Sequence, residues 1–212
     1  MSRVRVHGFS ISLDGFGTGE PQTLESPFGH AGERLHEWML GTAAWLGDSG
    51  SYGIANDLVK RSNQGVGATI MGRNMFSPTR GAWEDESWRG WWGENPPYHN
   101  PTFVMTHHPR PDLEMEGGTT FRFVAGSPAE VLAMAREAAG EQDVQVAGGV
   151  SVLRTFLKEG LIDEAHIVIT PLVLGRGERL WDGLENLTDT YAVSEAVGIG
   201  NVTHLRLVKK SV

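Results

Sequence analysis

The chain has 212 residues, a formal net charge of −8 and no cysteine. The missing cysteine excludes disulfides, zinc–cysteine sites, iron–sulfur clusters and thiol nucleophiles. The acidic balance disfavours a broad nucleic-acid-binding surface, so we expect any anionic ligand to be bound locally, by a few cations and backbone N–H groups. No apolar run approaches the ~18 residues of a membrane span, and the N-terminus lacks a signal-peptide core. We therefore expect a cytoplasmic protein with no membrane or nucleic-acid partner.

Apolar residues follow strand-like and helix-like patterns along the chain. Ser127, Pro128 and Glu130 form a helix-start signature, and Gly140 is suited to end that helix. The other expected helices span residues 33–40, 53–62 and 151–159, and the expected strands span 4–13, 67–71, 102–106, 120–124, 144–147 and 165–173. Two further strands, at 190–197 and 203–208, are expected to pair as a C-terminal antiparallel hairpin.

The alternation of strands and helices predicts an α/β fold, with a mostly parallel central sheet flanked by helices. We expect one domain over residues 1–212, because neither a repeat nor a linker interrupts the pattern. Residues 77–101, which hold four of the 7 tryptophans, are expected to form an irregular insertion. Two interpretations of its aromatic residues stay open. They form a wall against a flat ligand ring, or they pin the loop or a subunit interface; the wall would use Trp88, Trp91 and Trp92.

Three expected strands end in polar or glycine-rich segments, and this is the most informative feature of the sequence. In an open parallel sheet, ligands bind at the carboxyl ends of the strands, where helix N-termini also point. A Gly-Gly pair between a strand and a helix lets a diphosphate approach backbone N–H groups. The three segments are Gly72-Arg73, Thr106-His107-His108 and Gly148-Gly149-Val150-Ser151.

Each segment also has a plain structural interpretation. Gly148 and Gly149 could simply form a tight turn, and Arg73 could be a solvated arginine. His107 and His108 could lie in a polar loop, or one of them could pack beneath the sheet. No metal-ligand spacing surrounds these histidines, so we expect no metal.

Nucleophilic hydrolysis has little support, because the chain contains no G-x-S-x-G motif. Asp14 stands at the end of the first expected strand, beside a glycine-rich loop. It could orient or protonate a heterocyclic substrate, or cap the turn. We take Asp14 as the candidate catalytic residue.

The strand ends, in this order, resemble the dihydrofolate reductase-like fold. The similarity is greatest to the C-terminal reductase domain of riboflavin-biosynthesis deaminase-reductases and to its stand-alone relatives. It covers nearly the whole chain and is most specific in its last part. The residues that carry it are Ser12-Leu13-Asp14-Gly15, Ile70-Met71-Gly72-Arg73, Val146-Ala147-Gly148-Gly149, and the run from Phe156 through Leu161-Ile162-Asp163-Glu164 and Pro171 to Gly175-Arg176-Gly177.

The resemblance implies NADPH bound across the strand ends and a homodimer. Gly72, Arg73 and Asn74 would face the cofactor phosphates. Thr106, His107 and His108 would lie near the adenosine 2′-phosphate. The diphosphate would be held by Gly148, Gly149, Val150 and Ser151, and the flexible loop beside the nicotinamide would be formed by Phe16, Gly17 and Thr18.

The implied function is an NADPH-dependent reductase of a small heterocycle, of the 5-amino-6-(5-phosphoribosylamino)uracil reductase type, acting by direct hydride transfer. Two positions depart from the family pattern: Phe16 stands where a basic residue is usual, and Ala147 where glutamate is usual. These departures leave open the physiological substrate. They also keep open an alternative, a non-catalytic or regulatory protein that binds a nucleotide or pterin on the same fold.

Overall fold

The computed structural model describes residues 2–211 and divides into two compact units. Unit 1 comprises residues 2–5 and Gly65–Ile162, and unit 2 comprises Val6–Gln64 and residues 163–211. Strand β1 (Val4–Ser12) begins in unit 1 and continues into unit 2. The expectation of one domain over the whole chain stays a prediction.

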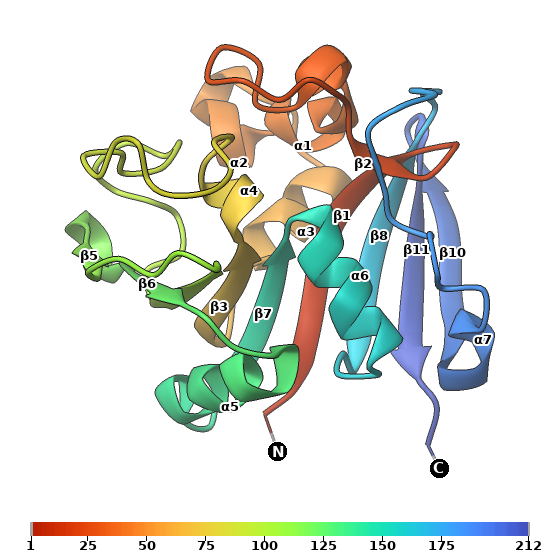
Figure 1. Ribbon diagram of the computed structural model, residues 1–212. Helices are drawn as coiled ribbons and strands as arrows, with labels where there is room; N and C mark the ends of the chain where they lie inside the picture. Colours follow the sequence, from red (N-terminus) through yellow and green to blue (C-terminus); the bar gives the residue numbers. More distant parts are fainter. Residues whose placement is uncertain (1, 212) are drawn as a thin grey trace. The chain divides into compact units, whose positions relative to one another are not determined.

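Unit 1 is built on the parallel strands β7, β3, β4 and β6, followed by the antiparallel β5, and the first two residues of β1 pair with β7. Helices α5 and α6 pack against these strands (Figure 1). The elements are β3 (Val66–Gly72), α4 (Arg73–Phe76), β4 (Pro101–Met105), β5 (Leu113–Glu114), a 3-10 turn (Glu116–Gly118), β6 (Thr120–Val124), α5 (Pro128–Ala139), β7 (Asp143–Gly148) and α6 (Val150–Lys158).

Unit 2 contains the strand order β10-β11-β8-β1, in which β10, β11 and β8 are antiparallel. A second, two-stranded sheet pairs β2 with β9. The elements are β2 (Phe16–Thr18), α1 (Glu37–Leu40), α2 (Ala43–Leu46), α3 (Ile54–Arg61), β8 (Glu164–Thr170), β9 (Glu178–Arg179), α7 (Leu187–Thr190), β10 (Tyr191–Ile199), β11 (Val202–Lys209) and the 3-10 helices Gly29–Leu35 and Gly47–Ser49.

The mixed α/β class, the parallel strands and the C-terminal hairpin are confirmed. The predicted start of α5 is also confirmed: Ser127 Oγ accepts the Glu130 N–H, and the Glu130 carboxylate accepts the Ser127 N–H. Gly140 follows the helix with φ 61°, a conformation that glycine adopts without a steric penalty.

Three local expectations were wrong. Phe16–Thr18 is not a loop but strand β2, because its backbone pairs with β9. Strand β8 ends at Thr170, before Pro171, which cannot donate a ladder hydrogen bond. The helix expected at 33–40 is divided between the 3-10 helix Gly29–Leu35 and the short α1.

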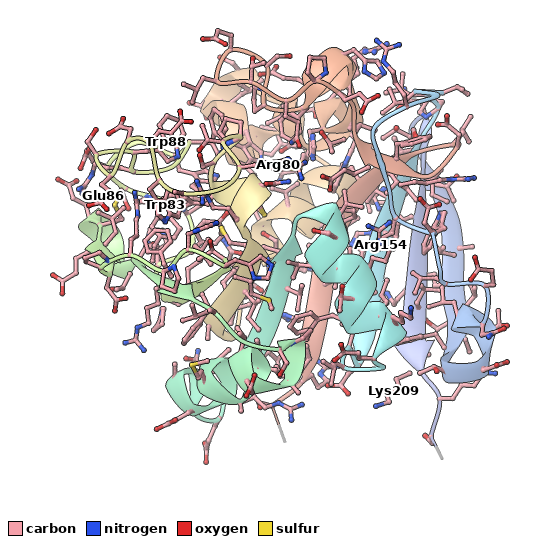
Figure 2. The ribbon with its side chains drawn as sticks, in the orientation of Figure 1. Arg80, Trp83, Glu86, Trp88, Arg154 and Lys209 are labelled. Carbon is pink, nitrogen blue, oxygen red and sulfur yellow. The ribbon has the colours of Figure 1, made fainter. Side chains whose placement is uncertain are left out.

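The insertion at 77–101 is irregular, as predicted, yet it is packed on a hydrophobic cluster of unit 1. Trp83, Trp88 and Trp92 contact this cluster from the insertion. Figure 2 shows Trp83, Glu86 and Trp88 on the loop near β5 and β6. The buried members of the cluster are Met71, Phe76, Tyr98, Val104, Met115, Phe121 and Phe123.

Candidate functional site

The three predicted strand ends of unit 1 lie at the same edge of its parallel sheet. In the register of β3 with β4, Gly72 pairs with Met105, directly before Thr106. In the register of β3 with β7, Met71 pairs with Gly148. The structure therefore brings together the carboxyl ends of three neighbouring strands, as expected for a ligand-binding edge.

Gly148 and Gly149 connect β7 to the N-terminus of α6, and their peptide bond is cis. Gly148 has φ 141°, a backbone conformation that residues with a side chain rarely adopt. At Gly149, a Cβ would meet no heavy atom within 4 Å, so its backbone faces open space. No side chain caps α6 at this residue, which leaves first-turn N–H groups suited to bind an anion. Val150 is buried in the core, whereas Ser151 is exposed.

Gly72 has a packing role that its sequence position did not reveal. A Cβ at Gly72 would lie 2.9 Å from Val152 Cγ2 and 3.4 Å from the Gly149 nitrogen. The absence of a side chain thus permits the first turn of α6 to approach the end of β3. Gly72 shapes the edge, whether or not it also contacts a ligand.

Arg73 is held by the insertion. Its Nη1 donates to the Gly81 carbonyl at 3.1 Å, and its Nη2 donates to Thr79 Oγ1 at 3.1 Å. Its guanidinium carbon lies 3.2 Å from the centroid of the Trp83 ring. Burial, and then the nearby Arg110 charge, lower the pKa of Arg73. Arg73 is therefore not the solvated arginine of the plain structural interpretation.

Asn74, which follows Arg73, points its side-chain oxygen at another arginine. The amide oxygen accepts from Arg80 Nη2 at 2.8 Å. Figure 2 places Arg80 close to α4. A second guanidinium is thus present beside the end of β3.

Beyond β4, Thr106 is buried, whereas His107 and His108 are exposed. Thr106 Oγ1 accepts the His108 N–H at 3.1 Å, and this bond fixes the turn after the strand. The His108 carbonyl accepts from Trp83 Nε1 at 2.6 Å. Of the alternatives for the two histidines, the structure shows the polar loop and not packing beneath the sheet.

The tryptophans predicted as a substrate wall pin the insertion. Trp88 Nε1 donates to the Phe76 carbonyl at 2.8 Å, and Trp91 packs edge-on against Trp88. Trp92 stacks on Phe121, with ring centroids 5.8 Å apart. The structure thus supports the interpretation in which the aromatics hold the loop, and contact with a substrate stays a prediction.

Asp14 of unit 2 caps a turn. Its carboxylate accepts a hydrogen bond from the Ser12 hydroxyl at 2.6 Å. It also accepts hydrogen bonds from the N–H groups of Leu174 and Gly175, at 3.1 and 2.7 Å. Partial burial alone would raise the pKa of Asp14, but these hydrogen bonds outweigh it and lower the pKa to about 2. An acid of this pKa is ionised at neutral pH, and a role for Asp14 in orienting or protonating a substrate stays a prediction.

The residues predicted beside the nicotinamide are held in β2 of unit 2. Phe16 pairs with Arg179, and Thr18 pairs with Glu178. Phe16 also contacts a small cluster formed by Ala31, Leu35 and Leu174. Thr18 is buried, while Phe16 and Gly17 are half-buried. Their role toward a cofactor stays a prediction.

Sequence reasoning missed three residues of the unit 1 edge. Trp83 contacts two guanidiniums, those of Arg73 and Arg110, with Arg110 Cζ 4.3 Å from its ring centroid. Arg110 also donates to the carbonyls of Glu86 and Trp88, at 3.1 and 2.6 Å. Thr79 is the third. The dense mixture of tryptophan and arginine near the strand ends was the available signal, since guanidiniums stack well on indole rings.

Residues 2–211 contain neither a cluster that could bind a metal ion nor a helix that could span a membrane. No group of three or more histidines or carboxylates is arranged to hold a metal ion. No helix there combines the length and the apolar character needed to cross a membrane.

Comparison with known proteins points to one family. The family model of the RibD C-terminal domain matches residues 6–209. No curated protein sequence matches the chain.

Solved structures share the fold at low sequence identity. A candidate riboflavin biosynthesis protein from Shewanella sp. PV-4 is 22% identical over the full length of both chains, with a TM-score of 0.61. Dihydrofolate reductase from Enterococcus faecalis, complexed with NADP(H) and RAB-propyl, is 14% identical, with 99% of this chain and 97% of that chain covered and a TM-score of 0.54.

A bifunctional protein from Thermotoga maritima is a third neighbour. It is a diaminohydroxyphosphoribosylaminopyrimidine deaminase/5-amino-6-(5-phosphoribosylamino)uracil reductase, 14% identical, with a TM-score of 0.52. The match covers 99% of this chain but 57% of that protein. Together these neighbours establish a dihydrofolate reductase-like fold.

Proposed function

Since the chain belongs to the RibD C-terminal domain family, we propose that it is an NADPH-dependent reductase of a small heterocyclic substrate in riboflavin biosynthesis. The substrate class is a pteridine or an aminopyrimidine of the 5-amino-6-(5-phosphoribosylamino)uracil type. Two of the neighbours named above support this choice: one is complexed with NADP(H), and another is a reductase of that aminopyrimidine.

The single observation that carries the proposal is the open backbone at Gly149. Three strand ends meet the N-terminus of a nine-residue helix there, and a Cβ at Gly149 would occupy empty space. This arrangement offers backbone N–H groups and a positive helix end to a diphosphate, at a place where its oxygens can approach closely. In an acidic chain, such local binding is how an anionic cofactor is held.

The residues of unit 1 fit a phosphorylated dinucleotide. Gly148, Gly149 and the first turn of α6 would hold its diphosphate, and the edge beside Arg73 and Arg80 carries positive charge. When bound, the dinucleotide supplies a hydride. The contribution of the protein is to bind, to orient and to stabilise charge through these backbone donors and guanidiniums.

Adding one methyl group at Gly149 tests the proposal. Gly149 has φ −64°, which alanine adopts readily, so Gly149→Ala should change the free energy of unfolding by no more than about 0.5 kcal/mol. The added Cβ would occupy the space of the diphosphate, so we expect NADPH to bind at least about tenfold more weakly, measured by calorimetric titration.

Gly198→Ala is the matched control, because a Cβ there also meets nothing within 4 Å and the residue lies on the exposed hairpin of unit 2. It should leave NADPH affinity unchanged. Equal affinities for wild type and Gly149→Ala would contradict the proposed cofactor site. NADPH binding without oxidation of NADPH by any pteridine or aminopyrimidine would favour the regulatory alternative.

The homodimer stays a prediction. Strand β10 offers one surface for it, since residues 193–198 are exposed and include the apolar Val193 and Val197. Within residues 2–211, β10 pairs on one side alone, with β11. The unpaired backbone N–H and C=O groups of an exposed strand edge offer a template for pairing with a second copy.

A further inference from the structure

Both hydrogen-bonding edges of the Arg73 guanidinium are engaged or buried. A guanidinium binds phosphate with two parallel N–H groups, through the Nη1–Nη2 edge or through the edge that includes Nε. The insertion occupies the first edge, through the Gly81 carbonyl and Thr79 Oγ1. On the second edge, Nε is buried without a hydrogen-bond partner. In this arrangement Arg73 cannot form a paired contact with phosphate.

The faces of the guanidinium are restricted as well. Trp83 covers one face at 3.2 Å, and Arg110 lies over the same indole ring at 4.3 Å. The two positive charges share one aromatic ring, and the nearby Arg110 charge lowers the pKa of Arg73. No carboxylate forms an ion pair with Arg73 in the part of the chain that the structure describes. Arg110 has the carboxylates of Glu86 and Asp85 as countercharges, so an incoming anion would supply the countercharge that Arg73 lacks.

The contacts at Thr79 and Gly81 can change without releasing the insertion. Trp83 is anchored separately by the His108 carbonyl, and Trp88 by the Phe76 carbonyl. Arg110 additionally binds the carbonyl groups of two residues of the insertion. These bonds hold the loop while the short segment 79–81 exchanges its partner.

We propose that Thr79 and Gly81 are internal competitors for the phosphate that Arg73 binds, so that Thr79 sets the affinity of the site for a phosphorylated dinucleotide. This inference rests on the proposed function, which supplies the dinucleotide. Without ligand, the Thr79 hydroxyl and the Gly81 carbonyl accept the two Nη groups. A phosphate oxygen displaces them, because its negative charge adds a Coulomb attraction to the guanidinium that the neutral hydroxyl and carbonyl oxygens do not offer. The bonds lost from Thr79 and Gly81 weaken the net binding.

The test is Thr79→Val, which removes the competing hydroxyl while keeping the size and branching of the side chain. We expect NADPH to bind about three- to tenfold more tightly than to wild type, measured by calorimetric titration so that changes in tryptophan emission do not interfere. Thr79→Ser keeps the hydroxyl and should restore wild-type affinity. Ser87→Ala is the control within the same insertion, since Ser87 bonds Asp85 and not Arg73; its affinity should equal that of wild type.

Titration with NADH identifies the phosphate. Tighter binding of NADPH alone assigns Arg73 to the 2′-phosphate, and tighter binding of both nucleotides assigns it to the diphosphate. Unchanged or weaker binding of both by Thr79→Val, with its thermal unfolding intact, would overturn the competition while leaving the proposed function standing. A wild-type protein that binds neither nucleotide would overturn both.

Discussion

Each of the two units has one prominent group of polar side chains, and the two groups lie at different places on their strands. In unit 1, arginines and glycines lie at the carboxyl ends of parallel strands, where the sheet stops providing hydrogen-bond partners. In unit 2, polar side chains lie along the strands: His166 on β8 and His204 on β11 are both buried. The first arrangement leaves groups able to exchange partners with a ligand, whereas the second ties them into the fold.

Two buried histidines of unit 2, His166 and His204, are hydrogen-bonded to each other, and each has a defined tautomer. The Gly8 N–H donates to His166 Nδ1 at 3.2 Å, so His166 carries its proton on Nε2. That nitrogen lies 2.8 Å from His204 Nδ1, which must accept, so His204 is protonated on Nε2. These hydrogen bonds are complete only while both rings are neutral. The difference between the units therefore predicts that acid disturbs unit 2 first.

The largest expected effect is a fall in the free energy of unfolding of the protein at acid pH. Burial, followed by the His7, His204 and Arg206 charges, lowers the pKa of His166 to about 3, and burial lowers that of His36 to about 4. Since both values lie below the unfolded value of 6.5, the two rings contribute stability above pH 6.5 that is lost as the pH falls. Each ring lowers the free energy of unfolding by ~1.4 kcal/mol per pH unit in this range. We therefore expect the free energy of unfolding to fall by about 5 kcal/mol between pH 6.5 and 4.5.

Urea unfolding at several pH values measures the loss, and hydrogen exchange with mass spectrometry locates it. Peptides from β8 and β11 should lose protection before peptides from β3 and β7. His36→Phe removes one titrating ring, which lies beside Phe28. The slope of the free energy of unfolding against pH should therefore fall by about half. Simultaneous loss of protection in all four strands would show that the contrast between the units is not reflected in their stability.

An intermediate loss of stability is expected when one of two neighbouring tryptophans of unit 1 is truncated, and it should differ between the two. Trp92 contacts the buried cluster, whereas the ring contact of Trp91 is with Trp88. Truncating a packed aromatic side chain costs about 3 kcal/mol, and truncating a peripheral one about 1 kcal/mol. Trp92→Ala should therefore destabilise the protein clearly more than Trp91→Ala in urea unfolding. Equal small losses, with NADPH oxidation abolished in both, would instead favour the substrate wall.

The smallest expected effect concerns Asp14 of unit 2. Asp14→Ala removes the acceptor of the Leu174 and Gly175 N–H groups, and because the exposed Gly175 N–H can bind water instead, the free energy of unfolding should fall by about 1 kcal/mol. Asp14→Asn keeps one acceptor oxygen and should lose about half as much. The lowered pKa means that this contribution is present above pH 3.8 and disappears as the pH falls through about 2.

Steady-state NADPH oxidation, measured well below the unfolding temperature, separates the two roles of Asp14. Turnover that survives in Asp14→Asn assigns the carboxylate to the turn. Turnover lost in both variants, with intact folding, would make Asp14 a residue that orients the substrate.

Much of the fold could be predicted because local signals agreed with the tertiary structure. The capping box at Ser127 and the alternating pattern of β6 each specify one conformation. Strand β2 could not be predicted, because Phe16-Gly17-Thr18 has the composition of a loop and becomes a strand through pairing with residues more than 150 positions away. The division of 33–40 likewise depends on contacts that a local pattern does not encode.

The convergence of three strand ends was predicted, but the side-chain contacts around them were not. The three strand ends were found because glycines and polar residues mark the points where apolar strands stop. The state of Arg73 was not, because its partners Thr79, Gly81 and Trp83 belong to a segment without periodicity. Packing decides which side chains an irregular loop exposes. The spacing of residues along the sequence does not predict that packing.

The discontinuity of the two units has a consequence for how the chain folds during synthesis. All residues of unit 1 precede Asp163, so its parallel strands are complete in sequence while the remainder is still being translated. Unit 2 joins Val6–Gln64 to residues 163–211, and β8 has no neighbour on one side until β11 has emerged. The part of β1 that belongs to unit 2 therefore lacks its neighbour β8 until most of the chain has been translated. The N-terminal part of unit 2, although made first, is the part that a chaperone would have to protect longest.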